Sequence, residues 1–329
     1  MARSIAFREA LREALNEEMR RDDRVFLMGE EVAEYNGAYK VSQGMLAEFG
    51  PRRVIDTPIS ELGFAGIGVG AAQKGLRPVI EFMTWNFAVL ALDQILNTAS
   101  KMLAMSGGQV NCPIVFRGPG GSAGQLGAQH STAFESYYAN IPGIKVVSPS
   151  NGYDAKGLLK QAIRYEEDPV MFMESEVMYG EKSEIPEEEY YIELGKADVK
   201  KQGTDVTIVS YNKMMKVALG AAAELEKENV NAEVIDLRTV RPLDWMTILE
   251  SVKKTNRLVI IDEQWPMCSI SSEIAYRIQK EGFDYLDAPI RRIAAADAPL
   301  HYAPNLVAAA LPDVGRTIQL VKEVMYMKK

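Results

Sequence analysis

Short apolar runs rich in β-branched residues alternate along the chain with longer segments whose apolar residues recur at helical spacing. The runs predict strands at Val25–Met28, Arg53–Asp56, Pro78–Phe82, Ile114–Arg117, Lys145–Ser148, Val170–Glu174, Val206–Ser210, Ala232–Asp236, Arg257–Asp262 and Ile290–Ala294. The spacing predicts helices near 61–74, 88–105, 151–166, 213–228, 244–254, 269–281 and 313–327. This alternation is typical of α/β folds with doubly wound parallel sheets.

The alternation is interrupted once. Residues 179–196, YGEKSEIPEEEYYIELGK, are acidic, contain a proline and show no sustained period, as an interdomain connector does. A chain of 329 residues with 47% hydrophobic residues is long enough for two cores. We therefore predict α/β domains at 1–180 and 197–329, joined by a linker at 181–196.

The N-terminal segment of the chain reads as an amphipathic helix, with apolar residues from Ile5 to Met19 interrupted by charges. It lacks the pattern of a secretion signal, a transit peptide or a membrane span. The net charge of −8 provides no basic field for nucleic acid or anionic lipid. Cys112 and Cys268 have no metal-ligand spacing, which fits a reducing compartment. We expect a cytoplasmic protein without nucleic-acid or membrane partners.

Candidate chemistry follows several predicted strands at their carboxyl ends, where ligands bind in open α/β sheets. The residues are Glu30 and Glu31 after VFLMG, Glu61 after VIDTPIS, Trp85 and Phe87 in VIEFMTWNF, and His130 in VFRGPGGSAGQLGAQHS. Each also has an ordinary interpretation. An acidic residue at Glu61 complements a helix dipole, strand-end carboxylates are commonly solvated, aromatic residues fill cores, and loop histidines form hydrogen bonds.

The glycine-rich segments do not match the phosphate-binding patterns GxxxxGK[ST] or GxGxxG after a strand. The segment GFAGIGVG continues the helix that begins near Glu61. Its small residues predict close packing of this helix against another backbone, in this chain or in a second subunit.

Taken together and in order, seven segments closely resemble the β subunit of the thiamine-diphosphate-dependent 2-oxoacid dehydrogenases, the E1 component of multienzyme complexes. The segments are GEEVAEYNGAYKVSQG, DTPISELGFAGIGVGAA, EFMTWNF, DQILNTASKMLAMSGG, VFRGPGGSAGQLGAQHS, PGIKVVSPSNGYDAKGLL and LRTVRPLDWMTI. They lie between residues 29 and 248. The segments ISELGF and EFMTWNF resemble those of the pyruvate branch of this family.

The resemblance implies a transketolase-like fold, with a pyrimidine-binding domain followed by a transketolase C-terminal domain, in an α2β2 heterotetramer. In this family a GDG motif with a later Asn holds Mg²⁺ and the diphosphate, and GDG does not occur in this chain. The resemblance therefore implies that a separate α subunit holds Mg²⁺ and that thiamine diphosphate is shared between subunits. The implied partners also include the lipoylated E2 acyltransferase, and the implied substrate is pyruvate.

The same resemblance implies roles for four residues. Glu61 would hydrogen-bond N1′ of the aminopyrimidine, and a dry, tightly packed setting would suit a carboxyl group that keeps its proton. Phe87 would pack on the pyrimidine, and Glu30 would lie close to the cofactor. His130 would stand near the channel for the lipoyl arm and move protons during acyl transfer.

Some relatives also bind K⁺ in this subunit. The matching residues here are Ile114, Ala162 and Ile163, with Asp168 as the side-chain ligand in a segment, RYEEDPV, that is one residue longer than expected. Leu90 stands where some relatives carry a polar side chain, which would shorten any proton relay between paired sites.

Three alternatives remain open from the sequence. The chain could be the E1β of a branched-chain 2-oxoacid or acetoin dehydrogenase, a homodimeric transketolase-like enzyme complete in one chain, or a non-catalytic scaffold that has kept the fold. The missing GDG argues against the second, and the retained Glu61 and His130 argue against the third.

Overall fold

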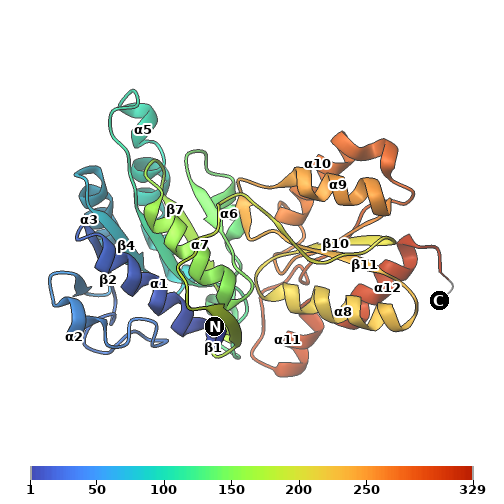
Figure 1. The fold of residues 1–329 in the computed structure, drawn as a ribbon, viewed down its shortest axis with the longest axis horizontal. Coiled ribbons are helices and arrows are strands. Elements are labelled where there is room, and N and C mark those ends of the chain that lie inside the picture. The colour runs from blue at the N-terminus through green and yellow to red at the C-terminus, as the bar shows by residue number, and fades with distance from the viewer. Residues whose placement is uncertain (1, 328–329) are drawn as a thin grey trace.

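The computed structural model describes residues 2–327 and contains two α/β bodies side by side (Figure 1). The N-terminal body, coloured blue to green, is built on a seven-stranded sheet in the order β12-β6-β7-β5-β4-β2-β3, to which the C-terminal half of the chain contributes β12. Its strands are β2 (Val25–Gly29), β3 (Val54–Asp56), β4 (Arg77–Glu81), β5 (Val115–Pro119), β6 (Lys145–Val147), β7 (Val170–Glu174) and β12 (Thr239–Arg241). All pair in parallel except β12, which runs antiparallel to β6.

The helices of this body cover both faces of the sheet. The longer ones are α1 (Phe7–Arg21), α3 (Glu61–Gln73) and α7 (Gly152–Arg164). The short ones are α2 (Met45–Phe49), α4 (Trp85–Ala88), η1 (Val89–Ala91), the π-helix η2 (Gln94–Ala99), α5 (Met102–Met105), η3 (Ala128–His130), α6 (Glu135–Ala139) and η4 (Glu176–Met178). Along β2, Val25 and Leu27 pack with α1 and α7, whereas Phe26 and Met28 pack on the side of α3. Burial on both faces explains why these strands read as continuous apolar runs.

The C-terminal body contains a five-stranded sheet in the order β14-β13-β10-β11-β9. Its strands are β9 (Asp198–Lys201), β10 (Val206–Ser210), β11 (Ala232–Asp236), β13 (Leu258–Ile261) and β14 (Arg291–Ile293). Its helices are η5 (Asn212–Met214), α8 (Met215–Lys227), α9 (Trp245–Thr255), α10 (Ile270–Gly282), η6 (Phe283–Tyr285), α11 (Pro304–Ala310) and α12 (Val314–Val324). One hydrophobic core continues from α3 of the first body to α9 and α10 of the second.

The predicted α/β class is confirmed, and most predicted elements are present within a few residues. The prediction of a single helix near 88–105 is wrong, because this stretch divides into η1, the π-helix η2 and α5. Ser100 donates its hydroxyl to the Leu96 carbonyl at 2.7 Å. A hydroxyl that bonds a carbonyl of the preceding turn competes with the regular helix ladder, which accounts for the irregularity.

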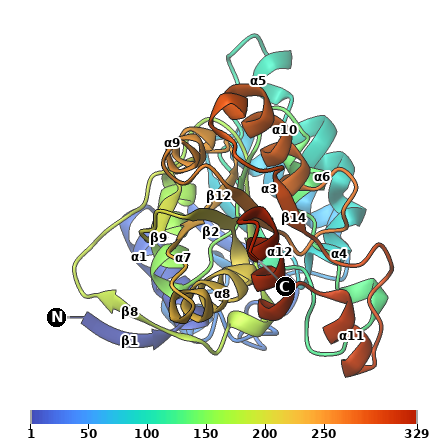
Figure 2. The ribbon, with the colours of Figure 1, turned by 90° about the vertical axis from the view of Figure 1, so that its right-hand side faces the viewer.

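Two further differences concern the N-terminus and the predicted linker. Residues Ala2–Ala6 form strand β1 rather than the start of the helix, and they pair antiparallel with β8 (Lys182–Pro186), at the periphery of the molecule (Figure 2). The predicted linker at 181–196 therefore contains a strand. The domain boundaries themselves stay a prediction. None of the helices between residues 2 and 327 is long and apolar enough to cross a membrane.

Two of the glycines of α3, Gly66 and Gly68, serve packing within this chain. A Cβ at Gly68 would lie 2.6 Å from Cδ1 and 2.8 Å from Cγ1 of Ile80, a fully buried residue of β4. A Cβ at Gly66 would lie 3.3 Å from Oε1 of Gln94 in η2. A Cβ at Gly70, by contrast, would meet nothing within 4 Å. Gly68 thus sets the distance between α3 and the sheet, and with it the position of Glu61 at the start of the helix.

Gly68→Val should destabilise the chain by about 1–3 kcal/mol, because Ile80 has no free space into which it can move. Gly70→Ala is the matched control on the same helix and should be neutral or stabilising by about 0.5–1 kcal/mol. Thermal and urea unfolding followed by circular dichroism would measure both. Equal midpoints for the two variants would contradict this account of the packing.

Candidate active site

The two candidate carboxylates lie at one edge of the first sheet. Glu30 directly follows β2, and Glu61 is the first residue of α3, which follows β3. Strands β3, β2, β4 and β5 are parallel neighbours, so their carboxyl ends share this edge. Glu30 is 5% exposed and Glu61 is 3% exposed. The loop between β3 and α3 thus turns an acidic side chain inward beside another one.

The environment of Glu30 favours its protonated form. Burial, followed by the neighbouring charge of Glu61, raises the pKa of Glu30 to about 7. Oε1 of Glu30 is buried and has no hydrogen-bond partner among the described residues. A buried acceptor without a donor is costly, so this atom is suited to a ligand that brings an N–H or O–H group.

Phe87 and His130 form a second pair near this edge. Phe87 lies in α4, whose N-cap residue Thr84 accepts a hydrogen bond from the Asn86 backbone at 3.3 Å. His130 ends η3 in the loop after β5. The two half-buried rings meet edge to face, with centroids 5.2 Å apart and an interplanar angle of 83°. This contact joins the loop after β4 to the loop after β5.

Trp85, the other aromatic candidate, belongs to the core. It is fully buried, with its ring 5.7 Å from that of Phe82 and 4.9 Å from that of Tyr138. The ordinary interpretation of Trp85 as a packing residue therefore holds in the structure. Leu90, which stands where some relatives carry a polar side chain, is 64% exposed in η1.

A buried ion cluster behind this edge was missed by the sequence reasoning. Arg117 of β5 donates to both carboxylate oxygens of Glu174 on β7, at 2.7 and 2.5 Å, and to Glu81 on β4. Tyr179 donates its hydroxyl to Glu174 at 2.7 Å. Burial raises the pKa of Glu81 and that of Tyr179. The available signal was the presence of charged residues at the ends of otherwise apolar strands, in VIEF and VFRG.

The candidate potassium ligands already have partners. The Ile114 carbonyl accepts from the Val170 backbone at 2.9 Å, and the Ala162 carbonyl accepts from the Tyr165 backbone at 3.3 Å. The Ile163 carbonyl accepts from the Arg77 guanidinium at 2.9 Å. Asp168 pairs with Lys145 at 2.9 Å. Each carbonyl retains a second lone pair, whereas the Asp168 carboxylate is directed at a cation of this chain.

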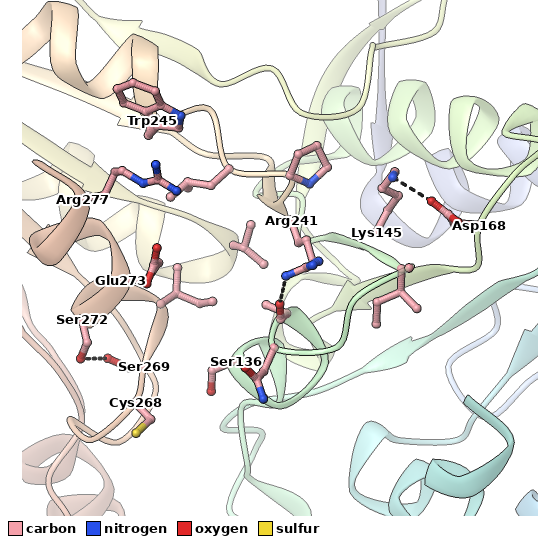
Figure 3. A pocket seen from close by; sticks show the side chains of 18 residues that line it. Ser136, Lys145, Asp168, Arg241, Trp245, Cys268, Ser269, Ser272, Glu273 and Arg277 are labelled. Atoms are coloured by element: carbon pink, nitrogen blue, oxygen red, sulfur yellow. Dashed lines mark hydrogen bonds and ion pairs between the residues drawn. The ribbon is translucent and has the colours of Figure 1, made fainter. Parts of the chain in front are cut away.

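A cavity lies away from these carboxylates, between the two bodies. It encloses about 810 Å³ and is lined by residues of α6, β6, β12, α9 and α10. Figure 3 shows the Lys145–Asp168 pair on one side of it and Arg277 beside the Trp245 ring on the other. A much smaller recess beside His130 is lined by Tyr39, Thr84 and Glu176 among others. The buried carboxylates, rather than cavity size, mark the candidate site.

Comparisons with known proteins place this geometry in a family. Residues 3–182 match the model of the transketolase pyrimidine binding domain, and residues 195–316 match that of the transketolase C-terminal domain. The fold is similar to a split gene transketolase described as an inactive beta4 tetramer, with TM-score 0.80, 22% identity and coverage of 99% of this chain and 100% of that one. A transketolase from Pichia stipitis aligns with TM-score 0.67 and 14% identity, over 98% of this chain and 46% of that one. The predicted transketolase-like fold is confirmed.

Three relatives are similar in sequence over nearly the whole chain. The pyruvate dehydrogenase E1 component subunit beta of Rickettsia bellii is 56% identical over 98% of this chain and 99% of its own length. That of Rhizobium meliloti is 55% identical, over 98% of this chain and 70% of its own length. The mitochondrial subunit beta-2 of Oryza sativa is 52% identical over 99% of this chain and 87% of its own length. The chain belongs to the family of pyruvate dehydrogenase E1 component β subunits.

Glu30→Gln should change the pH dependence of stability. The pKa of Glu30 rises from 4.5 for an ordinary glutamate to about 7 in the folded chain. The folded chain therefore holds this proton more tightly, so the stabilisation is complete below pH 4.5 and is lost as the pH rises through 7. The difference in melting temperature, variant minus parent, should therefore be more positive at pH 8.5 than at pH 5.

Calorimetry between pH 5 and 8.5 would measure this difference. The exposed neighbour Glu31 provides the control variant Glu31→Gln, which should follow the parent curve. Parallel curves for the parent and Glu30→Gln would show that Glu30 is charged throughout this range.

Proposed function

We propose that this chain, together with an α chain, catalyses the thiamine-diphosphate-dependent oxidative decarboxylation of pyruvate and the reductive acetylation of the lipoyl group of E2. The pair of buried carboxylates, Glu30 and Glu61, carries the proposal. The names of the relatives favour pyruvate over branched-chain 2-oxoacids and acetoin. The cytoplasmic location stays a prediction.

The residues fit the pyrimidine half of the cofactor. The unpartnered Glu30 Oε1 offers an acceptor in a dry place, and Glu61 lies beside it at the start of α3. Thiamine diphosphate, when bound, supplies the electron sink for decarboxylation. Glu61 would orient the aminopyrimidine through its carboxyl group, and Glu30 would hold a proton next to it. Phe87 would supply an apolar wall and exclude water.

His130 would act at a later stage of the reaction. Its ring packs against Phe87 and lies at the partly exposed end of the loop after β5. A group in this position can exchange protons with solvent and with an incoming lipoyl arm. We assign to His130 the movement of a proton during acyl transfer, separate from the work of the two carboxylates.

We assign the diphosphate and Mg²⁺ to the α chain. Among residues 2–327, no cluster of three or more His, Cys, Asp or Glu side chains is placed to hold a metal ion. An exposed apolar rim near the carboxylate edge, formed by Ile59, Leu62, Ile67, Val89 and Leu90, supports a partner chain there. Ile59 is 84% exposed and Ile67 is 64% exposed, which is typical of side chains that a subunit covers. The α2β2 assembly follows the family resemblance.

Glu61→Gln should lower pyruvate decarboxylation by the assembled α2β2 complex by about a hundredfold or more, since an amide cannot exchange a proton with N1′ of the aminopyrimidine as a carboxyl group can. An artificial electron acceptor would report this step without E2, and gel filtration would confirm assembly. Glu31→Gln is the control and should keep the parent rate. A Glu61→Gln complex with the parent rate would refute the catalytic assignment and favour the scaffold alternative.

A potassium ion bound by the carbonyls of Ile114, Ala162 and Ile163, with Asp168 as the side-chain ligand, is a further part of this proposal; Lys145 pairs with Oδ2 of Asp168, and Oδ1 would face the ion. Backbone carbonyls suit K⁺. The Cys112 backbone donates to the Glu167 carbonyl at 3.1 Å, which ties the loop after α7 to the segment that enters β5. Arg77 already donates to the Ile163 carbonyl, so a bound K⁺ would share this oxygen with the guanidinium.

If K⁺ binds these carbonyls, the thermal midpoint of the chain should rise in a saturable way with KCl. Choline chloride at the same ionic strength should not reproduce this increase. Differential scanning calorimetry of the two titrations would decide, and coincident midpoints would remove K⁺ from the proposal.

A further inference from the structure

The loop that carries His130 has little structure of its own. Between the end of β5 at Pro119 and the start of α6 at Glu135 it contains only the short helix η3. Gly121 and Gly127 have positive φ angles of 73° and 78°. Within the N-terminal body, the Gly121 backbone donates to the Thr132 carbonyl at 2.9 Å, and the Thr132 backbone donates to Asn86 at 3.2 Å. A loop of this composition requires other contacts to keep one conformation.

Those contacts come from the C-terminal body and converge on Ser122. Glu263, just after β13, accepts a hydrogen bond from the Ser122 backbone N–H at 2.5 Å. Lys213, in η5, donates to the Ser122 hydroxyl at 2.7 Å and also to the Ser122 carbonyl. Every polar group of Ser122 is therefore bonded to a residue from the other half of the chain.

Lys213 and Glu263 also bond each other, with Nζ and Oε1 2.7 Å apart. Their side chains are 6% and 11% exposed, so the ion pair is largely shielded from solvent. A charge pair withdrawn from water persists when further hydrogen bonds support it, and Ser122 supplies such bonds to Lys213 Nζ and to Glu263 Oε1. The ion pair and the loop therefore stabilise each other through Ser122.

Two glycines make this approach possible. A Cβ at Gly121 would lie 2.5 Å from Oε2 of Glu263, and one at Gly127 would lie 2.5 Å from Cζ of Tyr302. Tyr302 belongs to the segment before α11. The C-terminal body therefore holds the loop at two places, on the chain segment that leads directly to His130.

We propose that Lys213 and Glu263 are positioning residues, which clamp the loop at Ser122 and thereby hold His130 against Phe87 for acyl transfer. This inference rests on the role of His130 given under Proposed function. Glu30 and Glu61 are positioned by β2 and α3 and do not depend on the clamp. The clamp is thus specific for the second half of the reaction.

The test uses the assembled α2β2 complex with Lys213→Met and Glu263→Leu, singly and combined. The double variant removes both charges, so it avoids a lone buried charge and should melt closer to the parent than the less stable single variant. Acetylation of a lipoyl domain should fall roughly tenfold to a hundredfold in the double variant, whereas decarboxylation with an artificial acceptor should change by less than about threefold.

The control replaces another ion pair of the C-terminal body, Lys254 and Glu233, by Met and Leu. It should leave both rates unchanged. Hydrogen exchange of residues 120–132 should accelerate in the clamp double variant and remain at the parent rate in the control. If the double variant regains both the thermal stability and the lipoyl acetylation rate of the parent, the ion pair has a purely structural role and the proposal is overturned.

His130→Ala separates failure of the clamp from failure of the proposed function. If His130→Ala lowers lipoyl acetylation but loop exchange is unchanged in the clamp variant, the clamp is wrong and the function stands. If His130→Ala leaves lipoyl acetylation intact, the assigned role of His130 is wrong and the positioning inference falls with it.

Discussion

Two acidic side chains withdrawn from water beside each other set the central constraint of this structure. Glu30 and Glu61 cannot both carry a charge in that place without a large cost, because like charges repel strongly at low dielectric. A proton is therefore held near neutral pH, and the raised pKa of Glu30 expresses this. Burial thus gives Glu30 a carboxyl group that holds a proton near neutral pH and an oxygen, Oε1, without a hydrogen-bond partner. Two solvated glutamates would be ionised and hydrated instead.

The rest of the N-terminal body maintains this dry edge. Gly68 allows α3 to approach the sheet closely, which fixes the residue that begins the helix. Behind the edge, Arg117 ties the carboxyl ends of β4 and β7 to β5 through Glu81 and Glu174. One guanidinium facing two carboxylates leaves this cluster without a surplus of positive charge. It therefore braces the sheet and offers Glu30 no counterion to keep it ionised.

The C-terminal body has a more direct part in the site than its lack of catalytic motifs indicates. It shares a core with the first body, adds strand β12 to the first sheet, and contacts the His130 loop through Lys213 and Glu263. In this arrangement the two bodies position different groups. The first sheet positions the carboxylates, and the junction between the bodies positions the histidine.

The sequence by itself determined the α/β class, most of the helices and strands, and the places of Glu30, Glu61, Phe87 and His130 next to strand ends. It could do so because apolar periodicity is local and parallel strands bring their carboxyl ends to one edge. The resemblance to the E1β family, confirmed by the relatives, depended on the same ordered segments.

Only the tertiary structure decided how side chains distant along the chain combine. The hydrogen bond from Ser122 to Glu263 joins residues 141 positions apart, and that from Arg117 to Glu81 joins residues 36 apart. Strand β1 forms because β8 is there to pair with it, and Asp168 forms an ion pair with Lys145. Such pairings, and the pKa of Glu30, depend on burial and on distances in space, which local patterns of residues do not encode.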